Sequence, residues 1–287
     1  MLIALIGCAG LFALAGIAYV VWGGGAGDLE TYVTARGRFG AVATTATLFA
    51  SAMGSWILFG PPEAATWGGV PAADAWGASF GHPFVRVLVD GSLDSARFKV
   101  YQMQDAHYLE AIADAFVQIG VRCPDPDDKL WFVEAAERAL RTERSLHLHY
   151  GDALGYGPED LRTLELTPTN RVYQSHMLER IQRGTRLTAL AAVTPCPWLY
   201  RELGARIWDD LGGAVGDDHP YADWIRRYAD PDPDETMDLG ELLGRLDRWA
   251  DRHDAAARER ALTAFRTSAR YEYMFWEQAW TRQDWPV

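Results

Sequence analysis

Residues 98–116, FKVYQMQDAHYLEAIADAF, decide the fold, because large apolar side chains recur there at spacings of three and four. That period places them on one face of an α-helix. The face consists of Phe98, Tyr101, Asp105, Tyr108, Leu109, Ile112 and Phe116. A carboxylate within an apolar stripe needs a partner. Asp105 is therefore either a structural residue that bonds to a helix cap or a tyrosine, or a residue that orients a ligand.

Similar amphipathic segments fill the chain after the breaker at residues 68–71, with almost no alternating strand pattern. The sequence thus predicts an all-α domain over residues 71–287 and a separate segment over residues 1–70. We expect helices over about 72–89, 94–121, 127–154, 159–165, 168–186, 196–213, 220–229, 234–251 and 253–282. Asp94 and Asp127 suit N-cap positions, and Pro71, Pro168 and Pro197 suit first-turn positions.

The last predicted helix repeats the anomaly of a carboxylate on an apolar face. Its stripe consists of Phe265, Ala269, Glu272, Trp276 and Ala279. Desolvation would raise the pKa of the Glu272 carboxyl toward the range that is useful for proton transfer.

Cys196 follows an apolar run over residues 187–193 and stands between two prolines. If Pro197 occupies a first helical turn, the thiol lies near a helix N-terminus, where the helix dipole and free amides favour the thiolate. Tyr200 follows at i+4, on the same face. Taken alone, Cys196 also fits an inert core position, and so does Tyr173 with Met177 one turn later.

Composition excludes several classes of protein. The 287 residues include 27 basic and 39 acidic side chains, a net charge of -12, and an acidic surface disfavours nucleic-acid binding. The three cysteines, Cys8, Cys123 and Cys196, are widely spaced and form no CxxC pair, so neither a disulfide framework nor a zinc site is indicated.

The first seventy residues have a different character. Residues 2–22 and 41–60 carry no charge, and we expect two hydrophobic transmembrane helices there. The first run is long enough to span about 30 Å of hydrocarbon as a helix. Arg36 and Arg38 would place the loop between the runs on the inner side of a membrane. If this segment is retained, we expect the protein to attach to a membrane through residues 2–60. Otherwise we expect a cytoplasmic location.

Three short stretches in this segment resemble the start of a sodium:solute symporter: YVTARGR at 32–38, ASAMGSW at 50–56 and FGPPEA at 59–64. The resemblance implies that the second run contributes to a sodium and substrate site, but it stops near Val70 and the other membrane helices are missing. A transporter component, a membrane tether and a fusion without a role of its own are the readings left open.

The remaining chain, from about Ala72 to Trp285, resembles the TenA family, the thiaminase II type of aminopyrimidine aminohydrolase with a haem-oxygenase-like helical fold. The resemblance is carried by HPFV at 82–85, DGSL at 90–93, FKVYQMQD at 98–105, TPT at 167–169, SHM at 175–177, TPC at 194–196, HPY at 219–221 and YEYMFW at 271–276. So many motifs in order make it specific.

The resemblance implies a role for each candidate residue. Cys196 would be the nucleophile, Glu272 the proton-transfer residue and Asp105 the acceptor that grips the aminopyrimidine. Tyr108, Tyr173 and Tyr200 would shape the pocket. The expected partner is an aminopyrimidine or thiamine, with no cofactor and no metal, and the family suggests a homotetramer.

Two departures from the family pattern accompany this resemblance. Pro197 stands where many members have an aromatic residue, and the first helix is shortened because only residues 72–80 precede His82. The leading hypothesis is a hydrolase that releases hydroxymethylpyrimidine in thiamine salvage. The alternatives are a non-catalytic or membrane-localised pyrimidine-binding protein and a transporter fragment fused to a TenA domain.

Overall fold

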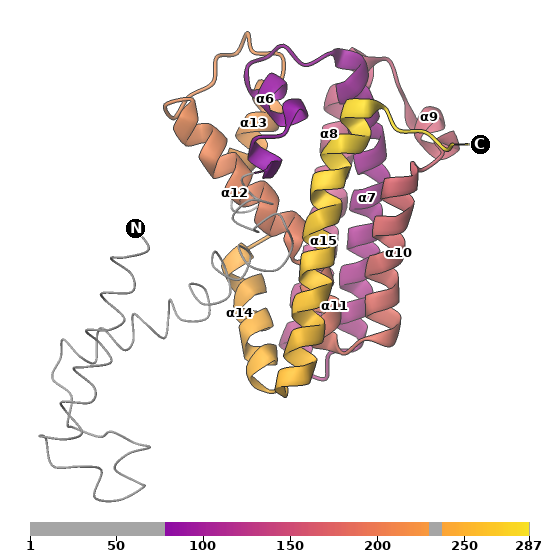
Figure 1. The fold of residues 1–287 in the computed structure, drawn as a ribbon, viewed down its shortest axis with the longest axis vertical. Helices are drawn as coiled ribbons and strands as arrows, with labels where there is room; N and C mark the ends of the chain where they lie inside the picture. Colours follow the sequence, from indigo (N-terminus) through magenta and orange to yellow (C-terminus); the bar gives the residue numbers. More distant parts are fainter. Residues whose placement is uncertain (1–77, 230–236, 287) are drawn as a thin grey trace, which may run out of the picture. The chain divides into compact units, whose positions relative to one another are not determined.

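The computed structural model describes residues 78–229 and 237–286, with the side chains at 143 and 146–148 left aside, and its regular elements there are helices (Figure 1). They are α6 (Pro83–Val89), α7 (Ser95–Val121), α8 (Pro126–Leu154), α9 (Pro158–Thr163), α10 (Pro168–Arg183), α11 (Arg186–Val193), α12 (Pro195–Asp210), α13 (Ala222–Ala229), α14 (Leu239–Asp251) and α15 (Ala255–Thr281). The prediction of an all-α fold is confirmed for this part of the chain.

The long helices α7, α8, α10 and α15 run side by side, and α12, α13 and α14 lie along one flank of them (Figure 1). Helices α7, α10 and α15 contact one another, α8 packs on α7, and α12 packs on both α13 and α15. Segments 70 to 170 residues apart in the sequence thus meet, which is how Asp105, Cys196 and Glu272 come to share one region.

Side-chain caps explain where the helices begin. Asp94 Oδ1 accepts from Ala96 N at 3.0 Å at the start of α7, as predicted. At the start of α8 the predicted cap, Asp127, is wrong: Asp125 Oδ1 accepts from the Asp127 N–H at 2.8 Å. Pro126 explains the difference, because a proline suits the first helical position and moves the cap to the residue before it.

Two predicted helices are divided by breaks. The segment predicted as 168–186 ends at Arg183, because Thr185 Oγ1 accepts from Thr188 N at 3.1 Å and caps a new helix, α11, over the apolar run. The segment predicted as 72–89 is interrupted at His82, whose Nδ1 accepts from Phe84 N at 3.1 Å and starts α6. In both places a local cap competes successfully with helix continuation.

Aromatic rings form the core beside the candidate site. Tyr101 of α7 stacks on Trp276 of α15 with centroids 5.3 Å apart, and Phe84 and Trp224 pack against these rings. All four side chains are fully buried. Burying each one stabilises the fold by roughly 1.5–3 kcal/mol, so α6, α7, α13 and α15 are held firmly around it.

A buried polar network ties α7, α10 and α15 together at one end of the bundle. Asn170 Nδ2 donates to the Gln104 backbone oxygen and to Gln104 Oε1, each at 2.8 Å. Thr167 donates to Gln104 Oε1 through its N–H and to Gln278 through its hydroxyl. The TPT motif at 167–169 is therefore structural.

A second pair of motifs is also structural. His219 Nε2 lies 3.0 Å from the backbone oxygen of Val89, and the Tyr221 hydroxyl donates to Leu93 O at 2.6 Å. Gly91 between them has φ +78, and a Cβ there would lie 3.3 Å from His219 Nε2. The DGSL and HPY motifs thus join the α6–α7 turn to the start of α13.

The predictions for the first seventy residues, namely two apolar spans, a symporter-like segment and membrane attachment through residues 2–60, lie outside the described residues. So does the boundary at residue 70, and the division into two domains stays a prediction. Within residues 78–229 and 237–286, the helices are too short or too polar to cross a bilayer.

Candidate active site

Cys196 is the second residue of α12, whose N-cap is Thr194 and whose first residue is Pro195. The predicted position near a helix N-terminus is therefore confirmed, with Pro197 in the first turn. Thr194 Oγ1 donates to Leu190 O at 2.7 Å and fixes the corner between α11 and α12. Only 9% of Cys196 is exposed.

One cavity of about 420 Å³ opens beside this corner. Its wall includes Asp105 from α7 and both Cys196 and Tyr200 from α12. All three side chains are buried, so a ligand at this inner end would be largely withdrawn from water. The structure thus brings together three of the six predicted site residues on one wall.

The other three residues form a cluster behind the thiol that does not line the cavity. Tyr173 of α10 donates to Glu272 Oε1 at 2.5 Å, and Tyr108 of α7 donates to the same oxygen at 3.4 Å. The rings of Tyr108 and Tyr173 lie 4.9 Å apart. Glu272 is not among the residues that line the cavity, and its Oε1 accepts from two buried tyrosine hydroxyls.

Burial dominates the ionisation of Glu272. Desolvation raises the pKa of this carboxyl from 4.5 to about 7, against the hydrogen bonds from Tyr173 and Tyr108, which lower it. The sequence-based prediction for this pKa agrees in direction and cause. A carboxyl with this pKa can accept or release a proton near neutral pH.

The thiol behaves differently from the prediction. Burial raises the pKa of Cys196 well above its usual value, and the negative charges of Glu272 and Asp105 raise it further. A hydrogen bond with Tyr108 lowers it, but this is the smallest contribution. The thiol is therefore protonated at neutral pH, and a thiolate requires a base to take its proton.

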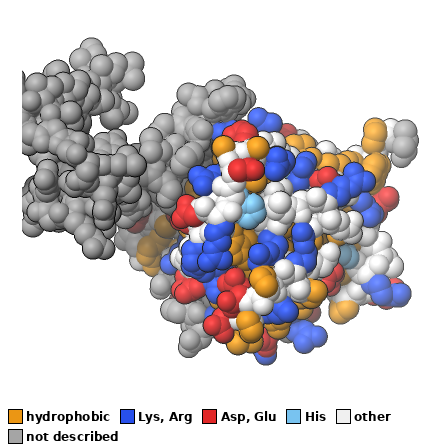
Figure 2. Space-filling view, turned by 90° about the horizontal axis from the view of Figure 1, so that it is seen from below, with side chains coloured by type: hydrophobic (Ala, Val, Ile, Leu, Met, Phe, Trp, Pro, Cys, Tyr) orange, Lys and Arg blue, Asp and Glu red, His pale blue; other side chains and the backbone are white. Residues whose placement is uncertain are grey.

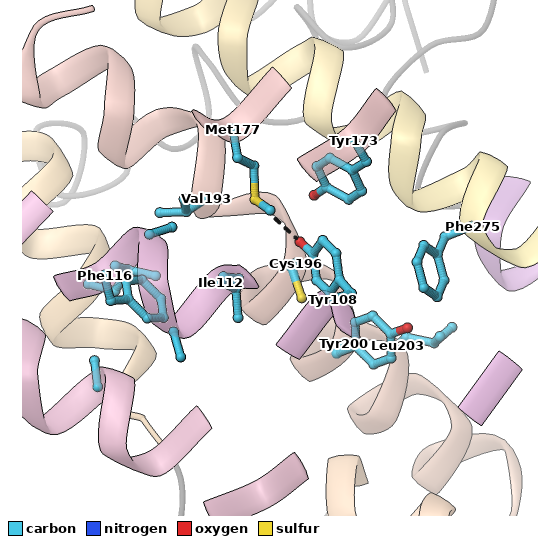
Figure 3. Packing of buried hydrophobic residues seen from close by; sticks show 14 of the residues in the cluster. Tyr108, Ile112, Phe116, Tyr173, Met177, Val193, Cys196, Tyr200, Leu203 and Phe275 are labelled. Atoms are coloured by element: carbon cyan, nitrogen blue, oxygen red, sulfur yellow. Dashed lines mark hydrogen bonds between the residues drawn. The ribbon is translucent and has the colours of Figure 1, made fainter. Parts of the chain in front are cut away.

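Figure 3 shows the surroundings of the sulfur. Cys196 lies beside the ring of Tyr108, with Tyr200 below and Tyr173 above it in this view. The Tyr108 hydroxyl also lies 3.8 Å from Met177 Sδ, drawn as a dashed line. The sulfur, the Tyr108 hydroxyl and the Glu272 carboxyl therefore follow one another in a buried series.

Tyr200 is held by the aromatic core. Its hydroxyl lies 3.0 Å from the Tyr101 hydroxyl, which in turn accepts from Trp224 Nε1 at 3.3 Å. Tyr228 of α13 packs against Tyr200 with ring centroids 4.8 Å apart and lines the cavity as well. Tyr228 was not predicted as a site residue, although its position at i+4 from Trp224 was a usable signal.

Other cavity residues were also missed. Arg138 of α8, Arg201 of α12 and Arg227 of α13 belong to its wall. In the sequence they have no mark that distinguishes them from arginines on a solvated helix face.

His82 has a structural role. Its Nδ1 accepts from a backbone N–H, so Nε2 carries the proton and donates to Glu277 Oε2 at 3.0 Å. Burial lowers the pKa of the ring, and Glu277 only partly offsets this. The HPFV motif therefore joins α6 to α15.

Comparison with known proteins shows a family match and several relatives. Residues 71–282 match the TENA/THI-4/PQQC family. The chain is 34% identical over 216 residues to an aminopyrimidine aminohydrolase of Halalkalibacterium halodurans, which covers 75% of this chain and 94% of that protein. A TenA homologue from P. horikoshii OT3 has a TM-score of 0.62 and 28% identity, covering 73% of this chain and 94% of its own.

A further solved structure bears on the fold alone. It is a domain with a heme oxygenase-like fold from Shewanella denitrificans, with a TM-score of 0.53 and 13% identity, covering 73% of this chain and 89% of that one. The prediction of a TenA-like domain is confirmed over residues 71–282, and that of a haem-oxygenase-like helical fold is confirmed for the part of the chain that the structure describes. From this match over most of its length, the chain is a member of the TENA/THI-4/PQQC family.

Proposed function

We propose that this chain is an aminopyrimidine aminohydrolase of the thiaminase II type. It hydrolyses aminomethylpyrimidine, and thiamine, to hydroxymethylpyrimidine in thiamine salvage. The observation that carries this proposal is the pair Asp105 and Cys196 on the wall of one cavity, with the Glu272 carboxyl coupled to the thiol from behind. The activity of the relative from H. halodurans supports the reaction class.

The aminopyrimidine binds at the inner end of the cavity. The Asp105 carboxylate accepts a hydrogen bond from the exocyclic amino group of the ring, and the rings of Tyr200 and Tyr228 line the same wall. The Cys196 sulfur lies on that wall too, in reach of the electron-poor ring. Binding thus positions the ring for attack.

Cys196 acts as the nucleophile. Its sulfur forms a bond to an electron-poor ring carbon, and the electron pair of the ring expels the amine from the exocyclic methylene. Water then adds to the methylene, the ring regains its aromatic electrons and the carbon–sulfur bond breaks. The net change is hydrolysis, with one water consumed and one amine released.

The proton from the thiol goes to Glu272. Because burial raises the pKa of Cys196, the thiolate forms only as its proton leaves. Tyr108 hydrogen-bonds to the sulfur and to Glu272 Oε1, so its hydroxyl can pass the proton between them. The protonated Glu272 then returns this proton through the Tyr108 hydroxyl, which hydrogen-bonds to the sulfur at the cavity wall, to the departing amine.

Product formation from aminomethylpyrimidine tests the proposal. The full-length chain should release hydroxymethylpyrimidine and ammonia in equal amounts, measured by chromatography and by an ammonia assay. Tight binding of aminomethylpyrimidine without turnover would instead favour a non-catalytic pyrimidine-binding protein.

The assembly we propose is a homo-oligomer, a tetramer by analogy with the family. Its support is a row of exposed apolar side chains on one face of α8, where Leu130 is 59% and Val133 54% exposed, with Leu140 further along. Light scattering tests it: the full-length chain should have several times its monomer mass, and Leu130→Asp with Val133→Asp should reduce that mass.

A further inference from the structure

Three arginines from three different helices line the cavity that holds Asp105 and Cys196. Arg138 comes from α8, Arg201 from α12 and Arg227 from α13. The reaction proposed for the inner end uses none of them. Their presence on one wall needs its own explanation.

Burial separates the cavity into two ends. Asp105 and Cys196 are buried at the inner end, Arg138 and Arg227 are half-buried, and Arg201 is exposed. The three arginine side chains are more exposed than Asp105 and Cys196, so the arginines lie toward the mouth of the cavity. A bound molecule that extends from the ring site to the mouth passes from a carboxylate to guanidinium groups.

The described part of the cavity wall is rich in arginine. The whole chain has 39 acidic and 27 basic residues, and the face drawn in Figure 2 carries basic and acidic side chains intermixed. Among residues 78–229 and 237–286, the cavity wall includes three arginines and two aspartates, Asp105 and Asp238. Asp105 belongs to the inner end, so among these described residues Asp238 is the carboxylate that accompanies the three arginines.

The remaining carboxylate has a task in the fold. Asp238 Oδ1 accepts from the backbone N–H of Glu241 at 3.0 Å and caps α14. Leu239 and Gly240, the first residues of that helix, also line the cavity, so the partial positive charge of a helix N-terminus adds to the arginines.

The arginines are placed differently within the wall. Arg227 Nη2 donates to Ser145 Oγ at 2.6 Å, which holds its side chain against α8. Arg201 is exposed and forms no ion pair with a carboxylate of residues 78–229 or 237–286. A solvated cation at a cavity mouth is the position from which a guanidinium can meet the anionic end of a ligand.

The separation of Cys196 and Arg201 along α12 fits a substrate with two parts. Arg201 follows Cys196 by five residues, which is about 7.5 Å along the helix axis. A leaving group made of a small ring with a two-carbon arm bridges such an interval, whereas a bare amine does not.

We propose that the outer end of this cavity binds a phosphate monoester carried on the leaving group of the substrate, held by Arg201 with Arg138 and Arg227. The inference rests on the function proposed above for the inner end. It adds phosphorylated aminopyrimidine compounds, such as thiamine monophosphate, to the substrate class. A guanidinium binds a phosphate by two parallel hydrogen bonds, which a neutral hydroxyl cannot replace.

Ligand affinities of the full-length Cys196→Ser protein test this inference, since that protein should bind without turnover. Calorimetry would compare thiamine with thiamine monophosphate. We expect the phosphate ester to bind at least about tenfold more tightly, and the ratio to fall toward one in Cys196→Ser with Arg201→Gln. Arg138→Gln provides a second variant for the same ratio.

The matched control is Arg260→Gln, an exposed arginine of α15 away from the cavity wall, which should keep the ratio. A ratio near one in the Cys196→Ser protein, or a ratio that Arg201→Gln leaves unchanged, would overturn the inference. So would inorganic phosphate that binds as tightly as the ester, because the ring would then contribute nothing.

Failure of the proposed function has a separate signature. The wild-type chain would then not hydrolyse aminomethylpyrimidine, while the affinity ratio between ester and thiamine would persist. If thiamine and its phosphate ester both failed to bind while aminomethylpyrimidine was hydrolysed, the inference about the outer end alone would be overturned.

Discussion

The Tyr173 hydroxyl donates to Glu272 Oε1 at 2.5 Å, so α10 and α15 are joined by a hydrogen bond directly behind the candidate nucleophile. This bond favours the charged form of a carboxyl that burial would otherwise keep protonated. The pKa of Glu272, about 7, reflects both effects. Four expectations follow from this arrangement and from the packing around it.

The pH dependence of turnover should report Glu272. In the proposed reaction Glu272 must be ionised to receive the thiol proton, so kcat/KM for aminomethylpyrimidine should rise with pH through about 7. Glu272→Gln should remove this limb and lower kcat by about 10²–10⁴-fold. A limb near pH 7 that persists in Glu272→Gln would assign it to another group.

Tyr173→Phe should shift the pH at which kcat/KM rises. Loss of the hydroxyl removes the hydrogen bond that most lowers the pKa of Glu272, so the limb should shift to higher pH by up to about one unit. Tyr273→Phe is the matched control, since Tyr273 lies on the exposed side of α15, the helix that carries Glu272. Equal profiles for the two variants would contradict the role of Tyr173.

The stability of the chain should depend on pH through Glu272. Because its pKa is about 7 in the folded chain and 4.5 ordinarily, the stability it contributes is present below pH 4.5 and lost as the pH rises through 7. The free energy of unfolding of Glu272→Gln relative to wild type should therefore increase by roughly 3 kcal/mol from acidic to alkaline pH. Urea titrations at several pH values measure this difference in free energy of unfolding. A difference that stays constant with pH would contradict the raised pKa of the buried Glu272 carboxyl.

Gly204→Ala should disturb the cavity from outside. A Cβ at Gly204 would meet the backbone of Tyr228, which lines the cavity. We expect a loss of about 1–3 kcal/mol in stability and a higher KM, because α13 must move away. Gly244→Ala in α14 is the control: its Cβ would meet only the end of the Arg248 side chain, at 3.3 Å, so stability should hold or rise slightly.

The sequence predicted the helices and the two buried carboxylates well, because both depend on local periodicity. Phe98, Tyr101 and Asp105 share one buried face as expected, and Glu272 is buried as expected. Helix α11 (Arg186–Val193) was not predicted, because the apolar run at 187–193 is short and the predicted helices were 168–186 and 196–213.

The thiol shows why the site was harder to predict than the fold. A helix N-terminus lowers a cysteine pKa, and this local argument gave the wrong direction for Cys196. Burial and the charges of Asp105 and Glu272, from helices distant in the sequence, raise the pKa of this thiol. The arginines at the mouth escaped notice for the same reason, because only the packing of α8, α12 and α13 brings them to one wall.

The most direct test of the account is the kcat/KM of Cys196→Ser for aminomethylpyrimidine, measured beside Cys123→Ser, which changes the other cysteine of the described residues. The account predicts a fall of at least about 10³-fold for Cys196→Ser with the helical circular dichroism unchanged, and little effect for Cys123→Ser. Turnover by Cys196→Ser at the wild-type rate would contradict it.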